Sequence, residues 1–161
     1  MRIVLLVIWV FLSTAAFAYG ASLATVKAAS HTLPDGRVEY IYSVTNNSKS
    51  NIAMVWVGYV FRSEEPELNI MPVGWDFFKG LPKGSCISPE GWDCLVVTQE
   101  ESNRHFLEWS IKESGAVPFK HGKVLNGFTI ILPKADAAYL KGHFTVFFDN
   151  DEPYSSSLTS R

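Results

Sequence analysis

Apolar and polar residues alternate along most of this chain, which is the pattern of half-buried β-strands. In residues 37–45 one face is apolar, consisting of Val38, Tyr40, Tyr42 and Val44. A run of Asn, Ser and Lys residues at 46–51 then supplies turn chemistry. The next run, 52–61, is apolar on both faces, which is typical of a strand buried within a sheet. Together the two apolar runs predict a β-hairpin.

Five further runs have the length and composition of strands. They are residues 22–29, 94–98, 105–112, 124–132 and 143–149. Only residues 134–140 have a helical pattern, long enough for one or two turns. About seven short strands with Gly, Pro and Asn turns between them predict an all-β fold, an immunoglobulin- or fibronectin-like antiparallel β-sandwich. An α/β fold would need helices between the strands.

The first 18 residues have the three parts of a secretory signal. Arg2 supplies the positive charge, Ile3–Leu12 is unbroken apolar sequence, and Ala16-Phe17-Ala18 is an A-x-A cleavage site. The alternative is a retained membrane anchor, but the apolar stretch is shorter than the ~20 residues that span a bilayer. We therefore expect a signal peptide at 1–18, a β-sandwich domain at 19–154 and a flexible tail at 155–161. No stable membrane insertion is expected after cleavage.

Composition narrows the class of protein. The chain has 161 residues, of which 47% are hydrophobic and 14% aromatic, and its formal net charge is −2. A nucleic-acid binder would need a basic surface, so no nucleic-acid partner is expected. An intrinsically disordered chain would have few aromatic residues, so the aromatic content of this chain argues against disorder.

The chain has two cysteines, Cys86 and Cys94. In an oxidising compartment such a pair predicts a disulfide, here closing a short loop that contains Pro and Gly. A metal site is the alternative, but there is no Cys-x-x-Cys spacing and no neighbouring His to support one. Two free thiols are the other alternative.

A short pattern, Pro-x-Gly-Trp-Asp, occurs twice. Residues 72–76 end in Trp75 and Asp76, and residues 89–93 end in Trp92 and Asp93. A Pro followed two residues later by Gly forms a tight turn that presents the next side chain. These four residues are the candidate ligand-binding residues, with the tryptophans contacting a sugar ring or a protein partner. The alternative is that both tryptophans plug the open ends of the sandwich. Trp56 and Trp109, inside strands, are expected in the core.

Signs of catalysis are weak. The chain has no nucleophile-elbow, zinc-protease or phosphate-loop motif, and we assign no catalytic residue, metal ligand or cofactor. A hydrolase would need one of the four histidines, or two carboxylates, assembled in space. The candidates are His31, His105, His121, His143, Glu64, Glu65, Glu67, Asp76 and Asp93. Residues 149–152 superficially match a calcium loop but lack the Gly and Glu that an EF-hand requires.

The segment Tyr40–Ser48, with its alternating aromatic residues and Asn-x-Ser, resembles the opening strands of bacterial exported immunoglobulin-like domains. The Pro-Val-Gly-Trp turn at 72–75 and the strand at 124–128 are similar to the same group. The resemblance implies a binding, adhesion or spacer module. One departure is the segment 117–123, where that group commonly has Pro-Gly before the closing strand.

These observations predict a secreted or periplasmic protein. The first hypothesis is a non-catalytic binding or accessory module that contacts an extracytoplasmic protein or carbohydrate through loop aromatics. The second is an envelope structural or assembly protein that acts through its sheet edges. A hydrolase is the third and least favoured.

Overall fold

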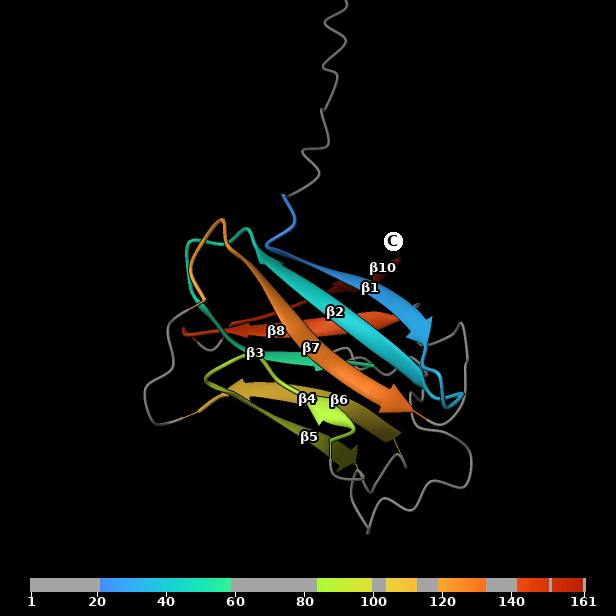
Figure 1. The fold of residues 1–161 in the computed structure, drawn as a ribbon. Helices are drawn as coiled ribbons and strands as arrows, with labels where there is room; N and C mark the ends of the chain where they lie inside the picture. The colour runs from blue at the N-terminus through green and yellow to red at the C-terminus, as the bar shows by residue number, and fades with distance from the viewer. Residues whose placement is uncertain are drawn as a thin grey trace, which may run out of the picture.

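The computed structural model describes residues 21–58, 84–99, 104–112, 119–132, 142–150 and 152–160. Several sequence predictions fall outside these residues: the signal peptide, the helix at 134–140, and the candidate site residues Trp75 and Asp76. Within them the fold is all-β, as predicted (Figure 1). The strands are β1 (Ala24–Thr32), β2 (Val38–Asn46), β3 (Ile52–Val57), β4 (Cys86–Ile87), β5 (Trp92–Gln99), β6 (Arg104–Ile111), β7 (Val124–Leu132), β8 (His143–Phe148), β9 (Pro153–Ser157) and β10 (Thr159–Ser160). Among the described residues, no helix is long and apolar enough to cross a membrane.

The strands form two sheets that pack face to face (Figure 1). The first sheet has the order β10-β1-β2-β7-β4, and the second has the order β5-β6-β3-β8-β9. All neighbours are antiparallel except β1 and β10, which are parallel. β1, β2 and β7 are ordered as the A, B and E strands of an immunoglobulin sandwich, and β3, β8 and β9 as its C, F and G strands. The fold is therefore an immunoglobulin-like β-sandwich.

The predicted hairpin between β2 and β3 is wrong. β2 pairs with β1 and β7, whereas β3 pairs with β6 and β8 in the other sheet. The turn at 47–51 therefore carries the chain from one sheet to the other. Side-chain alternation marks which face of a strand is buried, but it does not select the strand that pairs with it.

The inward faces of the two sheets make one apolar core. An aromatic series crosses it: Tyr42 lies 5.8 Å from Trp109, Trp109 lies 5.5 Å from Phe128, and Phe128 lies 5.2 Å from Trp92, measured between ring centroids. The last two contacts are edge-to-face, a favourable arrangement for aromatic quadrupoles. The prediction that Trp109 belongs to the core is confirmed.

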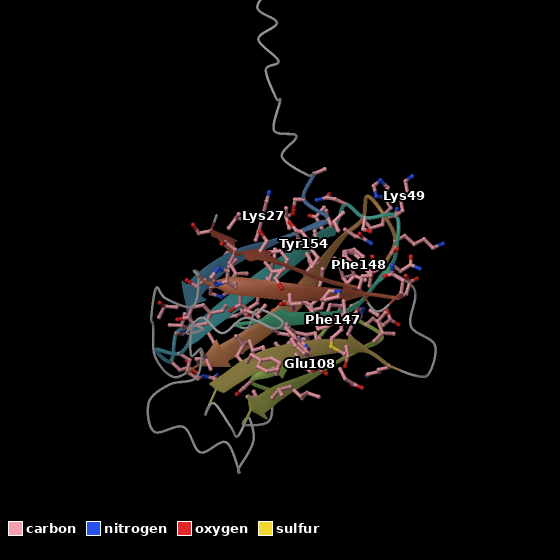
Figure 2. The ribbon with its side chains drawn as sticks, turned by 180° about the vertical axis from the view of Figure 1, so that it is seen from behind. Lys27, Lys49, Glu108, Phe147, Phe148 and Tyr154 are labelled. Carbon is pink, nitrogen blue, oxygen red and sulfur yellow. A yellow bond between two sulfur atoms is a disulfide. The ribbon has the colours of Figure 1, made fainter. Side chains whose placement is uncertain are left out.

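Trp56 does not lie in that core. It alternates with Val55 and Val57, which face inward, so its half-buried side chain lies on the outer face of the second sheet. There it packs against Phe106 and Phe147, and its Nε1 donates to Glu108 Oε2 at 2.8 Å. Figure 2 labels Glu108 and Phe147 on this side of the molecule. Because β3 is a central strand with apolar residues on both faces, its sequence alone does not distinguish the two sides.

The disulfide between Cys86 and Cys94 is confirmed. It joins β4, at the edge of one sheet, to β5, at the edge of the other, across a Cα–Cα distance of 6.2 Å. That distance is within the ordinary range for a disulfide. The bridge therefore closes one side of the sandwich in addition to closing a loop.

The predicted flexible tail at 155–161 is also wrong for its described part. Residues 153–157 form β9 and pair with β8, and Thr159 and Ser160 pair with β1. The Ser155 hydroxyl lies 2.8 Å from the hydroxyl of Thr145. Serine-rich sequence has little hydrophobic pattern, so pairing by backbone and hydroxyl groups leaves no signal in the alternation.

Candidate functional site

A groove of about 440 Å³ lies at the end of the sandwich where β2 ends and β3 and β7 begin, the left end in Figure 1. It is lined by Glu90, Trp92, Phe119, Lys120, Lys123, Val124 and Leu125. Its volume is in the range of sites that hold small ligands or side chains of a partner.

The floor of the groove is aromatic and almost completely covered. Trp92 is 3% exposed and Phe119 is 4% exposed. Trp92 contacts Phe128 edge-to-face, so its ring fills the end of the core, as in the plug alternative. A sugar that stacks on a tryptophan needs an open ring face, and Trp92 does not offer one. The aliphatic wall, by contrast, is open, since Val124 is exposed and Leu125 is partly buried.

The Pro-x-Gly-Trp turn explains the position of Trp92. The Trp92 amide donates to the carbonyl of Pro89 at 3.1 Å, and Gly91 has a positive φ of 79°, which favours glycine. The Lys112 amide donates to the carbonyl of Gly91 at 2.9 Å, which anchors the turn to the end of β6. The turn is present as predicted, but it presents Trp92 to the core.

Asp93 lies beside this turn but does not line the groove. It is the next residue of β5 after Trp92, and its side chain is exposed. Its Oδ1 lies 3.3 Å from Lys112 Nζ. The candidate pair Trp92 and Asp93 is therefore divided, with one side chain in the groove floor and the other in a surface ion pair.

Two lysines on the rim give the groove its charge. Lys120 and Lys123 are both exposed and stand at the two ends of a turn in which the Lys123 amide donates to the Lys120 carbonyl at 3.3 Å. Within the part of the chain that the structure describes, neither ammonium group has an ion-pair partner. Glu90 supplies a single negative charge from the β4–β5 turn.

Asn46 holds the lysine turn in place. This residue is fully buried, and its Nδ2 donates both to the Phe119 carbonyl at 2.7 Å and to the Ser50 carbonyl at 2.9 Å. Its Oδ1 accepts from the Ser48 amide at 2.9 Å. Its own backbone carbonyl accepts from the Gly122 amide at 2.7 Å. Asn46 begins an Asn-x-Ser sequon, but both of its amide hydrogens are used in the folded protein.

The lysine turn is not among the site residues that the sequence predicts. In the sequence, the segment Phe119-Lys120-His121-Gly122-Lys123 is distinguished only by its departure from a Pro-Gly pattern. The available signal was Gly122, whose positive φ of 71° makes the turn between the two lysines.

Among the residues that the structure describes, no group of three or more His, Cys, Asp or Glu side chains is suited to a metal ion. His31 is exposed and forms a cross-strand pair with partly buried Glu39, 3.0 Å from Nε2 to Oε2. His121 Nδ1 lies 2.9 Å from the Ser48 carbonyl. The candidate carboxylates Glu64, Glu65, Glu67 and Asp76 lie outside the described ranges.

Comparisons with known proteins return few similarities. No family model matches the chain, and no curated protein matches its sequence. Among solved structures, the fold is similar to that of an uncharacterised protein from Nocardia farcinica, which is described as having an immunoglobulin-like fold. The two chains are 13% identical, the match covers 81% of this chain and 82% of that one, and the TM-score is 0.47. It is also similar to part of a GH20 exo-β-N-acetylglucosaminidase from Vibrio harveyi, with 8% identity over 87% of this chain and 18% of that one, and a TM-score of 0.43. Neither similarity carries a functional argument for this chain.

Proposed function

We propose that this protein is an extracytoplasmic binding module without catalysis of its own, and that the groove between Glu90 and Leu125 is its contact surface. The observation that carries the proposal is the pairing of an apolar wall with two rim lysines that have no ion-pair partner in the described chain. The predicted signal peptide and the Cys86–Cys94 disulfide support an oxidising compartment outside the cytoplasm.

The chemistry of the groove favours a protein partner over a carbohydrate. The covered ring of Trp92 removes the stacking platform that a sugar would use. Val124 and Leu125 offer aliphatic contact, and Lys120 and Lys123 offer positive charge at its border. A segment that places a carboxylate next to an apolar side chain matches both features, since opposite charges give specificity and apolar burial gives affinity.

Isothermal titration calorimetry with a synthetic peptide of alternating leucine and glutamate tests the proposal. The matched probe is the same peptide with glutamine in place of glutamate. We expect the glutamate peptide to bind more tightly, and its affinity to fall as salt is added because both lysines are exposed to solvent. Replacing both lysines, Lys120→Gln with Lys123→Gln, is expected to weaken binding about two- to thirtyfold, because exposed ion pairs contribute about 0.2–1 kcal/mol each.

Lys27→Gln is the matched control. Lys27 is an exposed residue of β1 and does not line the groove (Figure 2). Lys27→Gln is expected to leave the affinity for the glutamate peptide unchanged. Equal binding of the two peptides, an unaltered affinity in the double variant, or no binding of either peptide would each contradict the proposal.

A further inference from the structure

The edges of the two sheets are not equally protected against pairing with another chain. β4 and β10, at the two edges of the first sheet, have two residues each. β9, at one edge of the second sheet, begins at Pro153 and continues into serines. β5, at the other edge, has eight residues with neither Pro, Gly nor Lys among them. Short strands, prolines and lysines are the usual protection of a sheet edge, and β5 has none of these.

The side chains of β5 add to this contrast. Its single charged residue, Asp93, stands at one end, in the ion pair with Lys112. On the outer face Leu95 is 44% exposed, and Val97 lies two residues farther along. No strand of the described chain pairs with the outer edge of β5. An exposed apolar strand edge of this length is a template for strand addition.

The register of β5 on β6 identifies the backbone groups that are open. The Lys112 amide donates to the Gly91 carbonyl, and Gly91 and Lys112 continue the register in which Trp92 lies opposite Ile111. In an antiparallel pair, alternate residues direct their backbone groups to the same neighbour. Odd-numbered residues of β5 therefore bond to β6. Cys94, Val96 and Thr98 direct their amide and carbonyl groups to the outer edge.

We propose that β5 pairs antiparallel with β5 of a second copy of this chain, centred on Val96. Val96 then lies opposite Val96 of the second copy, and Cys94 lies opposite Thr98, with these residues exchanging backbone hydrogen bonds. The second sheet of one copy then joins the second sheet of the other, forming one continuous sheet through an isologous, two-fold interface. The interface is separate from the lysine turn of the groove.

The sequence of β5 is complementary to itself in this register. On the outer face Leu95 lies opposite Val97 of the second copy, and Val97 lies opposite Leu95, so exposed Leu95 and partly buried Val97 cover each other. Asp93 lies opposite Gln99, so no like charges meet. These features favour a second copy of the chain over a different partner, because the same eight residues supply both halves of the contact.

Sedimentation equilibrium of the mature protein over a range of concentrations tests the proposal. We expect a reversible dimer in the wild type and a monomer in Leu95→Lys, since this substitution places a charge on each side of the interface. Leu23→Lys is the matched control, because Leu23 is 42% exposed and precedes β1 in the first sheet. Circular dichroism establishes that each variant is folded. A strictly monomeric wild type, or a Leu95→Lys protein that dimerises like the control, would overturn the proposal.

Cross-linking tests the register independently. Leu95 and Val97 of opposite copies form a pair without backbone hydrogen bonds, where Cα atoms approach to about 4.5 Å. A mixture of Leu95→Cys and Val97→Cys proteins is therefore expected to form a disulfide-linked dimer under mild oxidation faster than either protein alone. Equal rates in the mixture and in the separate samples would contradict the register centred on Val96.

Discussion

The indole nitrogen of Trp109 in β6 donates a hydrogen bond to the carbonyl oxygen of Ile87 in β4, 3.2 Å away in the opposite sheet. Trp109 lies opposite Cys94 on β5, so this bond and the Cys86–Cys94 disulfide join the same sides of the two sheets. The two links fix β4, and with it the turn at 88–91 that contributes Glu90 to the groove, against the second sheet. The structure of the candidate site therefore depends on contacts between the sheets as well as on its own lining.

Replacing Trp109 by Phe removes the donor and part of a fully buried ring. We expect Trp109→Phe to lower the free energy of unfolding by at least about 1–3 kcal/mol, since the Ile87 carbonyl loses its side-chain partner and the smaller ring leaves a cavity. Urea denaturation measures the change. Trp56→Phe is the control, because Trp56 donates to Glu108 from the partly exposed outer face, and a smaller loss is expected there. Equal losses in the two variants would contradict the role given to Trp109.

Removing the disulfide is expected to destabilise the domain. The bridge spans a sequence separation of eight residues, for which the chain-entropy estimate is about 2–3 kcal/mol. The double variant Cys86→Ala with Cys94→Ala should show this loss in urea denaturation, and addition of a reductant should then leave it unchanged. In the wild type the same reductant should lower the stability. Two alkylatable thiols in the wild-type protein would contradict the disulfide.

Asn46→Asp tests the support of the lysine turn. The substitution replaces a buried amide, which donates to Phe119 and Ser50, with a group that lacks these donors and places a carboxyl near two carbonyl oxygens. We expect a loss of at least about 2 kcal/mol in the free energy of unfolding. Asn47→Asp is the matched control, because Asn47 is the exposed neighbour in the same turn. A similar stability of the two variants would show that the buried amide does not hold the turn.

A pH prediction concerns the β1–β2 turn. Hydrogen bonds from the Arg37 side chain and backbone lower the pKa of Asp35 from its ordinary value of 3.8. Because the folded pKa is the lower one, the interaction is fully present above about pH 4 and is lost as the pH falls through the folded pKa. NMR titration of the carboxyl carbon should show the pKa rising toward 3.8 in Arg37→Ala. An unchanged pKa in that variant would exclude the Arg37 side chain as the main cause.

Much of the fold follows from the periodicity of burial. The predicted strand at 37–45 becomes β2, and that at 124–132 becomes β7 with the same bounds, because each has an apolar face that must be buried. The partners of each strand do not follow from that pattern. The turn after Asn46 has the composition of a hairpin loop, but it connects two sheets, since β2 and β3 each bury a face against the other sheet.

The candidate site was only partly accessible to sequence reasoning. The turn at 89–91 follows from its Pro and Gly, but the direction of Trp92 depends on the pairing of β5 with β6, which is a long-range contact. Lys120 and Lys123 form a rim only because Asn46, far away in the chain, binds the carbonyl of Phe119. No local pattern records such a contact.

The central claim is that the groove is the contact surface, and NMR titration of the isotopically labelled protein with the leucine–glutamate peptide tests it most directly. We predict that the amide signals of Glu90, Trp92 and residues 119–125 shift progressively with peptide concentration. The signals of β9 and of the β1–β2 turn should stay in place. Shifts confined to other surfaces, or no shifts at peptide concentrations that saturate binding in calorimetry, would contradict the claim.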